Sequence, residues 1–324
     1  MARQSLRIGI AAAAVALCAA GVAARAEGMR IVEDRKLEPG GKLVMEADAG
    51  SVELKGGASS GAHIVITSDY EDTRDNFDFK YEESAGQLKI IVKKKGSEGW
   101  LHISGKDIHA PHFEIKIPTQ TAVDVKTGGG HIELDSVKGT ATLRTSGGHV
   151  EVNELEGPLK VETSGGHISL KGVTGDASVE TSGGHIEAST LKGKLHAETS
   201  GGHISLKDVS GDIDASTSGG HISITGAGGR VKAETSGGHV EVAFARGNAR
   251  GGEIESSGGG VTVSVDPSLG FDVDAETGGG TVNSDVPITI EGRQSKSSLK
   301  GTIGRGGEAL HLRTSAGSIN IEKL

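Results

Sequence analysis

The chain has 324 residues, with 34 lysines and arginines against 43 aspartates and glutamates, and it carries 53 glycines and one cysteine. Aromatic residues are scarce, at one Trp, two Tyr and five Phe, which argues against a globular core built around aromatic rings. The excess of acidic residues disfavours nucleic acid and anionic membranes as partners.

Residues 1–26 have the pattern of a secretory signal peptide. Arg3 and Arg7 flank the start of an alanine-rich apolar run that ends near Ala24, and Ala24-Arg25-Ala26 has the small-x-small form of a cleavage site. Neither this run nor any later stretch reaches the roughly 20 apolar residues that a membrane span requires. Removal of the segment takes away three arginines and no acid, so the net charge changes from −9 to −9 − 3 = −12. We therefore predict an exported protein of the periplasm or cell surface, with no membrane span and no disulfide.

Residues 27–126 are predicted to form a β-rich N-terminal capping region that contains one degenerate coil. Apolar residues alternate at Leu43, Met45 and Ala47, and residues 49–54 then follow the pattern of the later repeats, with Ser51 at the position that histidine occupies there. The stretch 56–120 holds six of the eight aromatic residues. We expect wider strands or hairpins in this stretch, capping a narrow stack.

Residues 127–247 contain a regular repeat of 18 residues. The string TSGGH occurs six times, and a TGGGH variant precedes these copies, so that a histidine recurs every 18 residues. Each histidine precedes an alternating apolar segment, a glycine and a second alternating segment, as in Ile168, Leu170, Val173, Gly175, Ala177 and Val179. A fixed short period is typical of a solenoid.

Residues 248–324 are predicted to form irregular C-terminal coils and a cap. The segments around Thr281 and Ser318 align with the repeat, and each places a small polar residue at the histidine position. Between them, residues 285–307 include Pro287 and a polar run at 294–298, which predicts an inserted loop.

Stacking explains how such short segments bury their apolar side chains. One cassette cannot cover its own apolar face, but cassettes stacked about 4.8 Å apart pair every strand with the copies above and below. The paired glycines suit arcs that need positive φ or a close approach of two backbones, and the threonine before them is expected to close hydrogen bonds at the arc. The predicted fold class is all-β, a single-stranded β-solenoid (β-helix) with 18-residue coils.

The same motifs resemble a known family. The segment Phe113-Glu114-Ile115-Lys116-Ile117-Pro118, followed by repeated strand, glycine, strand and Thr-Ser-Gly-Gly units, is similar to the bacterial putative-adhesin family of β-strand-repeat proteins, a domain of unknown function. The resemblance implies a β-helical exported or envelope protein, and it brings no catalytic residues with it. This chain departs from the family in the histidine that follows the glycine pair.

The recurring histidines are the candidate site. Each precedes an inward Ile or Val, so we expect them to point outward and to stack in one column. Neighbouring imidazoles in such a column could share Zn²⁺, Cu²⁺ or Ni²⁺, with Glu133, Glu151, Glu187 and Glu241 two residues further on as additional ligands. The alternative is that the histidines were copied with the cassette and have no special role. The seven candidates are His131, His149, His167, His185, His203, His221 and His239.

Three functions follow from these patterns. The first is a non-enzymatic solenoid that presents a repetitive surface to a cell-envelope component, either a protein or a polysaccharide, and needs no cofactor. The second is a periplasmic metal-binding or pH-responsive protein that uses the histidine column. The third, a carbohydrate-active β-helix enzyme, requires two or three carboxylates gathered on one face, whereas the acidic residues here are scattered or follow the repeat.

Overall fold

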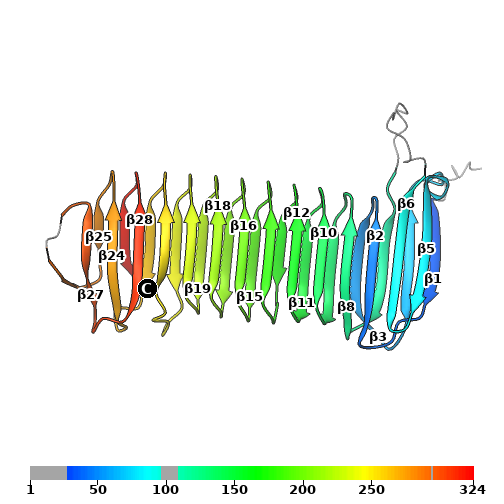
Figure 1. Cartoon of the computed structure of the whole chain (residues 1–324), viewed down its shortest axis with the longest axis horizontal. Helices are drawn as coiled ribbons and strands as arrows, with labels where there is room; N and C mark the ends of the chain where they lie inside the picture. Colours follow the sequence, from blue (N-terminus) through cyan, green and yellow to red (C-terminus); the bar gives the residue numbers. More distant parts are fainter. Residues whose placement is uncertain (1–27, 96–108, 293–294) are drawn as a thin grey trace, which may run out of the picture.

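The computed structural model describes residues 28–95, 109–292 and 295–324, and in these residues it is an all-β structure. There are 29 strands in this described part, together with one short helix, α1 (Thr73–Asn76). The strands form two long, mainly parallel sheets, sheet A with 14 strands and sheet B with 15, which run along the long axis of an elongated molecule (Figure 1). The expected all-β class is confirmed. The predicted signal peptide, residues 1–26, lies outside the described residues.

The central strands alternate between the two sheets. Paired residues in neighbouring strands are 18 positions apart, as in Val150 with Ile168 in sheet A and Ala141 with Leu159 in sheet B. Sheet A contains β9 (Ile132–Lys138), β11 (Val150–Glu156), β13 (Ile168–Lys171), β15 (Ile186–Leu191), β17 (Ile204–Val209), β19 (Ile222–Ala227) and β21 (Val240–Phe244). Sheet B contains β8 (Thr121–Thr127), β10 (Ala141–Thr145), β12 (Leu159–Thr163), β14 (Ala177–Thr181), β16 (Leu195–Thr199), β18 (Ile213–Thr217) and β20 (Val231–Thr235).

The N-terminal end departs from this simple order. Strand β2 pairs with both β6 and β8, and β3 pairs with both β7 and β9, so residues 41–58 lie between two segments that come later in the chain. Antiparallel pairs β1–β4, β4–β7 and β5–β6 extend this end. The strands are β1 (Met29–Arg35), β2 (Gly41–Ala47), β3 (Ser51–Ala58), β4 (Ala62–Ser68), β5 (Phe77–Ser84), β6 (Gln87–Lys94) and β7 (His112–Pro118).

The C-terminal end shows the same departure. Strand β28 lies between β22 and β24, and β29 lies between β23 and β25, so the last strands in sequence are not the last in space. Segment 285–307, predicted as a loop, contains β26 and β27, because Leu299 and Ile303 are buried when β27 pairs antiparallel with β24. The strands are β22 (Gly252–Ser256), β23 (Val261–Val265), β24 (Phe271–Thr277), β25 (Val282–Ser284), β26 (Ile288–Ile290), β27 (Ser298–Ile303), β28 (Glu308–Thr314) and β29 (Ile319–Lys323).

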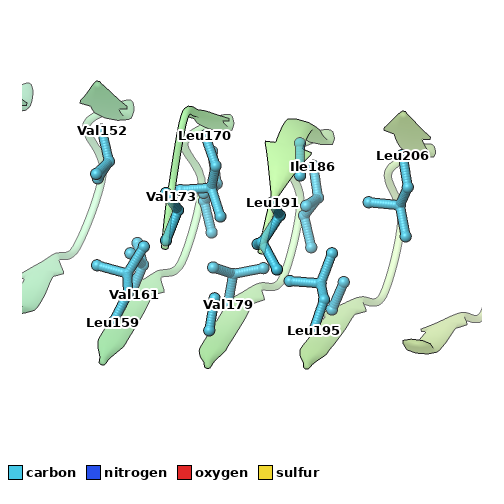
Figure 2. Packing of buried hydrophobic residues seen from close by; sticks show 14 of the residues in the cluster. Val152, Leu159, Val161, Leu170, Val173, Val179, Ile186, Leu191, Leu195 and Leu206 are labelled. Carbon is cyan, nitrogen blue, oxygen red and sulfur yellow. The ribbon is translucent and has the colours of Figure 1, made fainter. Parts of the chain in front are cut away.

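The core is one continuous apolar layer between the two sheets, mostly aliphatic, with buried phenylalanines at Phe77, Phe113, Phe244 and Phe271. Figure 2 shows Val152, Leu170 and Leu206 of sheet A pointing toward Leu159 and Val179 of sheet B. All five are at most 4% exposed. The alternation read from the sequence therefore places the predicted apolar positions in the core.

The arcs that precede sheet A explain two of the repeated residue types. Thr181 Oγ1 donates to the carbonyl of Gly166 in the preceding repeat at 2.9 Å and accepts from the backbone N–H of Gly184 at 3.3 Å. The threonines therefore form hydrogen bonds that hold the arc together, as predicted. A Cβ on Gly184 would overlap the carbonyl oxygen of Gly166, whereas a Cβ on Gly183 would have no atom closer than 3.8 Å. Neither glycine has positive φ, so only the second glycine of the pair is required, and the reason is close backbone approach.

Candidate functional site

The seven predicted histidines lie in one column along sheet A. Each immediately precedes a strand; six are exposed and His239 is half-buried. Six of the rings are stacked in sequence, from His131 to His221, with centroids 4.7 to 5.0 Å apart. The planes of the last four pairs lie within 8° of parallel. The structure thus brings together the residues that the sequence analysis selected, in the outward column that was expected.

A hydrogen bond links each of the first six rings, from His131 to His221, to the next repeat. The backbone N–H of His167 donates to Nδ1 of His149 at 2.8 Å, and the same bond recurs up to the N–H of His239 on Nδ1 of His221. The first bond of the series, from the N–H of His149 to His131, is 3.2 Å long. An accepting Nδ1 carries no proton, so in the neutral ring the proton resides on Nε2. These six rings therefore share one tautomer when neutral.

Serine makes the equivalent bond where histidine is absent. Ser51 Oγ accepts from the backbone N–H of His131 at 3.3 Å, and Ser318 Oγ accepts from the N–H of Thr281 at 3.2 Å. Histidine and serine at this position therefore serve as acceptors for the next backbone N–H along the stack. Serine provides that acceptor at any pH near neutrality, whereas histidine provides it only while Nδ1 is unprotonated. The sequence analysis identified the position but not this bond.

The stacked arrangement of the rings is unfavourable for the metal sharing that the sequence analysis considered. The part of the chain that the structure describes contains no group of three or more His, Cys, Asp or Glu arranged to hold a metal ion. The lone pairs of parallel rings also run parallel, whereas a shared Zn²⁺ needs two nitrogens aimed at one point about 2.0 to 2.1 Å away. A ring that binds metal through Nε2 usually donates a proton from Nδ1, and here Nδ1 faces a backbone N–H. Sharing a metal ion would require the rings to turn out of the stack.

Two titratable groups at the N-terminal end of the column, His149 and Glu133, have shifted pKa values. Partial burial, together with the neighbouring His131 and His167, lowers the pKa of His149 below its ordinary value. Burial, with Glu53 and Glu151 nearby, raises the pKa of Glu133. Both shifts disfavour the charged form of the group.

Sheet B has a different outer face, on which several lysines and arginines form ion pairs with carboxylates. A hollow of about 380 Å³ is lined by Arg144 and by Glu162, Glu180 and Glu198 from successive strands. Arg144 Nε contacts Glu162 at 2.9 Å, and Lys160 contacts the same carboxylate at 2.7 Å, which lowers the pKa of Glu162. These carboxylates follow the repeat.

A second hollow on sheet B, of about 550 Å³, is lined by acidic and basic residues from successive repeats. Asp176, Lys194, Asp212 and Arg230 alternate along it, and His196 lies 3.4 Å from Asp214. Three acidic and three basic residues line this second hollow, whereas the first has three glutamates against Lys126 and Arg144.

The family model described as Toastrack DUF4097, a domain of unknown function, matches residues 41–322. The chain belongs to the Toastrack family. The family resemblance predicted from the entry segment and the TSGG units is thus confirmed. In the described part of this Toastrack chain, no helix is long and apolar enough to cross a membrane.

Several solved structures resemble this Toastrack chain. A putative adhesin from Bacteroides fragilis is 10% identical with a TM-score of 0.38, covering 91% of this chain and 97% of its own. A putative adhesin from Parabacteroides distasonis is 12% identical with a TM-score of 0.35, covering 92% and 98%. A putative lipid binding protein from the same species is 12% identical with a TM-score of 0.31, covering 91% and 96%. A search among curated proteins found no match to this Toastrack chain.

Proposed function

We propose that this protein is an exported, non-enzymatic β-solenoid of 18-residue coils that presents a repetitive surface to a component of the cell envelope. Residues 1–26 are its signal peptide, 27–126 its N-terminal capping region, 127–247 its regular coils and 248–324 its irregular C-terminal coils and cap. It acts in the periplasm or at the cell surface, and its partner is a protein or polysaccharide surface. No cofactor takes part.

One observation carries this proposal: outward side chains recur in register along the central repeats. The rings from His131 to His221 stack 4.7 to 5.0 Å apart, and strand pairing places Glu162 beside Glu180 and Glu180 beside Glu198, so these two outer columns repeat at one-strand spacing. A surface of this kind offers many equivalent contacts to an extended partner, and such contacts add through effective concentration. A catalytic site instead needs a unique group of residues.

The experiment measures export and binding together. The full chain is expressed in a host with a periplasm, and mass spectrometry of the product should find Glu27 at its N-terminus. The mature chain should then cosediment with at least one isolated envelope fraction. A variant lacking residues 186–221, which joins His185 to Ile222 in the repeat pattern, should bind several-fold more weakly because contacts are lost. Retention in the cytoplasm, absence of binding, or unchanged binding after this deletion would contradict the proposal.

A second candidate function is supported by the bonds of the histidine column. The column serves as a pH-responsive or metal-binding element of a periplasmic protein, because each histidine bond depends on an unprotonated Nδ1. Zn²⁺, Cu²⁺ or Ni²⁺ would bind at His131, His149, His167, His185, His203, His221 or His239 after the rings turn. Native mass spectrometry of the mature chain with metal and with chelator tests the metal version. A metal stoichiometry that stays the same when all seven are changed to Ser would exclude it.

A further inference from the structure

A row of four residues of alternating charge lies at the start of four sheet B strands in the middle of the stack (Figure 1). Each residue immediately precedes β14, β16, β18 or β20. Backbone hydrogen bonds between successive repeats hold the row in register, as from the N–H of Ala177 to the carbonyl of Lys194 at 2.9 Å. All four residues line the hollow of about 550 Å³ described above. This alternating row consists of Asp176, Lys194, Asp212 and Arg230.

The charges of the alternating row are only weakly paired within the chain. Asp176 and Arg230, at its two ends, form no ion pair with any residue that the structure describes. Between them, Nζ of Lys194 lies 3.9 Å from Oδ2 of Asp212, and the two side chains are 71% and 46% exposed. Exposed pairs of this kind contribute little to stability. The row therefore leaves its charges available to another molecule.

The two aspartates of the alternating row are held in place by the next repeat. Oδ1 of Asp176 accepts from the backbone N–H of Lys194 at 2.9 Å, and Oδ1 of Asp212 accepts from the backbone N–H of Arg230 at 3.1 Å. A carboxylate has two oxygens and about four lone-pair sites, so each aspartate can still accept from an outside cation. Because the side chains are already ordered, a contact with them costs less conformational entropy.

A second row runs beside the alternating row on the same face, two residues further along each strand. Strand pairing joins its members in order from β12 to β22. Its four central members line the same hollow as the alternating row. The second row consists of Lys160, Ser178, His196, Asp214, Lys232 and Glu253.

Both rows are complementary to themselves in reverse order. A two-fold axis that is parallel to the strands and lies midway between β16 and β18 brings β14 opposite β20 and β12 opposite β22 of a second copy. Every charged residue of the two rows then faces an opposite charge or an uncharged side chain, and each contact is made twice. The facing pairs are Asp176 with Arg230, Lys194 with Asp212, Lys160 with Glu253, His196 with Asp214, and Ser178 with Lys232.

We propose that the corner formed by these two rows, from β12 to β22, is a surface through which two copies of this chain associate in antiparallel orientation. The inference goes beyond the proposed function, which concerns an envelope partner. Asp176 and Arg230, which form no ion pair within the described chain, face each other in this arrangement. Complementary charge of this kind fixes orientation and suppresses other pairings, because displaced copies bring like charges together.

The outward column beyond the second row limits the contact. It is acidic, and the same axis would place Glu180 opposite Glu234 and Glu162 opposite Glu255. Like charges facing each other are unfavourable, so the contact ends at the second row and follows the corner. Six strands span about 24 Å at about 4.8 Å per interval, and a contact two rows wide over that length is smaller than a standard stable interface. We therefore expect a weak, reversible dimer held mainly by charge.

Sedimentation velocity of the mature chain over a range of protein concentrations measures the association. In low salt we expect the weight-average sedimentation coefficient to rise with concentration toward that of a dimer. High salt should remove this rise, because exposed charges are screened. A coefficient that stays that of a monomer in low salt, or that rises equally in high salt, would overturn the inference.

Two single charge reversals test whether the row meets a second copy of itself. Lys194→Asp brings two carboxylates together across the axis, and Asp212→Lys brings two cations together, so each variant alone should associate at least about 10-fold more weakly. An equal mixture of the two variants has opposite charges at every facing position of the alternating row, so association should return. A mixture that associates no better than its components would overturn the inference.

The double variant Lys194→Asp with Asp212→Lys tests the orientation. Antiparallel copies keep opposite charges at all four facing positions, so the double variant should associate as well as the unchanged chain. A parallel contact displaced by one repeat, which the unchanged row would also allow, brings two carboxylates together and two cations together in the double variant. Loss of association in this variant would therefore overturn the antiparallel arrangement.

A matched control assigns the effect to this corner. Lys171→Asp makes the same change of net charge as Lys194→Asp but at an exposed position on sheet A, and it should leave association unchanged. Equal weakening by Lys171→Asp and Lys194→Asp would overturn the assignment of the surface. Melting curves of each variant exclude unfolding as the cause, and recovery in the mixture requires that both single variants are folded.

Discussion

The centre and the two ends of the stack use the same strands in different orders. From β10 to β21 each repeat pairs with the previous and the next repeat in sequence. At the N-terminal end residues 41–58 lie between later segments, and at the C-terminal end β28 and β29 lie between earlier ones. Three-residue strands β25 and β26 and antiparallel strands β1 and β5 then form the outer edges. In the centre, one repeated sequence is enough to form the fold because each strand has similar strands on both sides. At an edge, short or antiparallel strands are needed because they discourage pairing with further strands.

Burying a charge in the centre should have the largest effect. Ile204 of β17 is 1% exposed and has strands on both sides, so Ile204→Asp should destabilise the fold by several kcal/mol. Val282 of edge strand β25 pairs only with β29, so Val282→Asp should cause local fraying and a much smaller loss. Denaturant unfolding followed by circular dichroism measures both. Lys207→Asp, at an exposed position, is the control, and equal losses at Ile204 and Lys207 would contradict the assigned orientation.

The glycine pair offers a sharper contrast within one arc. Gly202→Ala places a Cβ against the carbonyl oxygen of Gly184, so the two repeats must separate, and we expect a loss of about 2 to 3 kcal/mol. Gly201→Ala meets nothing closer than 3.8 Å, at Ser182, and should change stability by less than about 0.5 kcal/mol. The free energy of unfolding of the two variants decides the matter. Similar losses would mean that the arcs do not stack this closely.

Replacing all seven column histidines with Ser gives the central repeats the acceptor of the outlying ones. The lowered pKa of His149 means that the unfolded chain takes up protons first. Stability should therefore fall as the pH drops from about 6.5 through the folded pKa, and then level off. We expect the melting temperature of the native chain to fall by a few degrees more than that of the variant between pH 7 and pH 5. If the melting temperatures of the native chain and the variant change equally with pH, the histidine column does not contribute to the pH dependence of stability.

The smallest effect is expected at the corner of each repeat. Thr190 has φ 56°, a left-handed conformation that costs a β-branched residue about 1 to 2 kcal/mol, while Gly172 and Gly226 occupy the same corner in other repeats. Thr190→Gly relieves that strain at an entropic cost of about 0.5 to 1 kcal/mol, so a net stabilisation of about 0.5 to 1 kcal/mol is expected. Thermal unfolding beside Gly172→Thr, which should destabilise, checks the sign. A loss of stability in Thr190→Gly would show that the corner is unstrained.

The periodic pattern predicted the position of each residue within a repeat. It placed Leu170 and Ile204 inward and His167 and Lys207 outward, because alternation along a strand requires only the local sequence. It did not predict the left-handed corner, because glycine occurs there only at 172 and 226, and elsewhere Glu154 or Asp208 adopts the same φ.

The periodic sequence pattern also did not predict the order of the repeats in space. The segment around Ser318 matches the repeat as well as the segment around Thr281 does. A residue's position within the repeat therefore does not indicate which other repeats its strand pairs with. The hydrogen bond to Nδ1 was missed for a related reason, because it joins two residues in different repeats and depends on the rotation of the ring. The sequence singled out the histidine column, but its tautomer and its acceptor role required coordinates.

The number of central repeats can change without changing either end of the stack. Central junctions such as that between His185 and Ile186 share one register and the residue pattern His-Ile or His-Val, so recombination between two repeats adds or removes one whole segment of 18 residues. The out-of-order strands at both ends contact only their own neighbours and are unaffected by such an event. Each exchange changes the distance between the two ends by about 4.8 Å, the spacing of paired strands. The fold thus keeps the same two ends while its length changes in equal steps of one repeat.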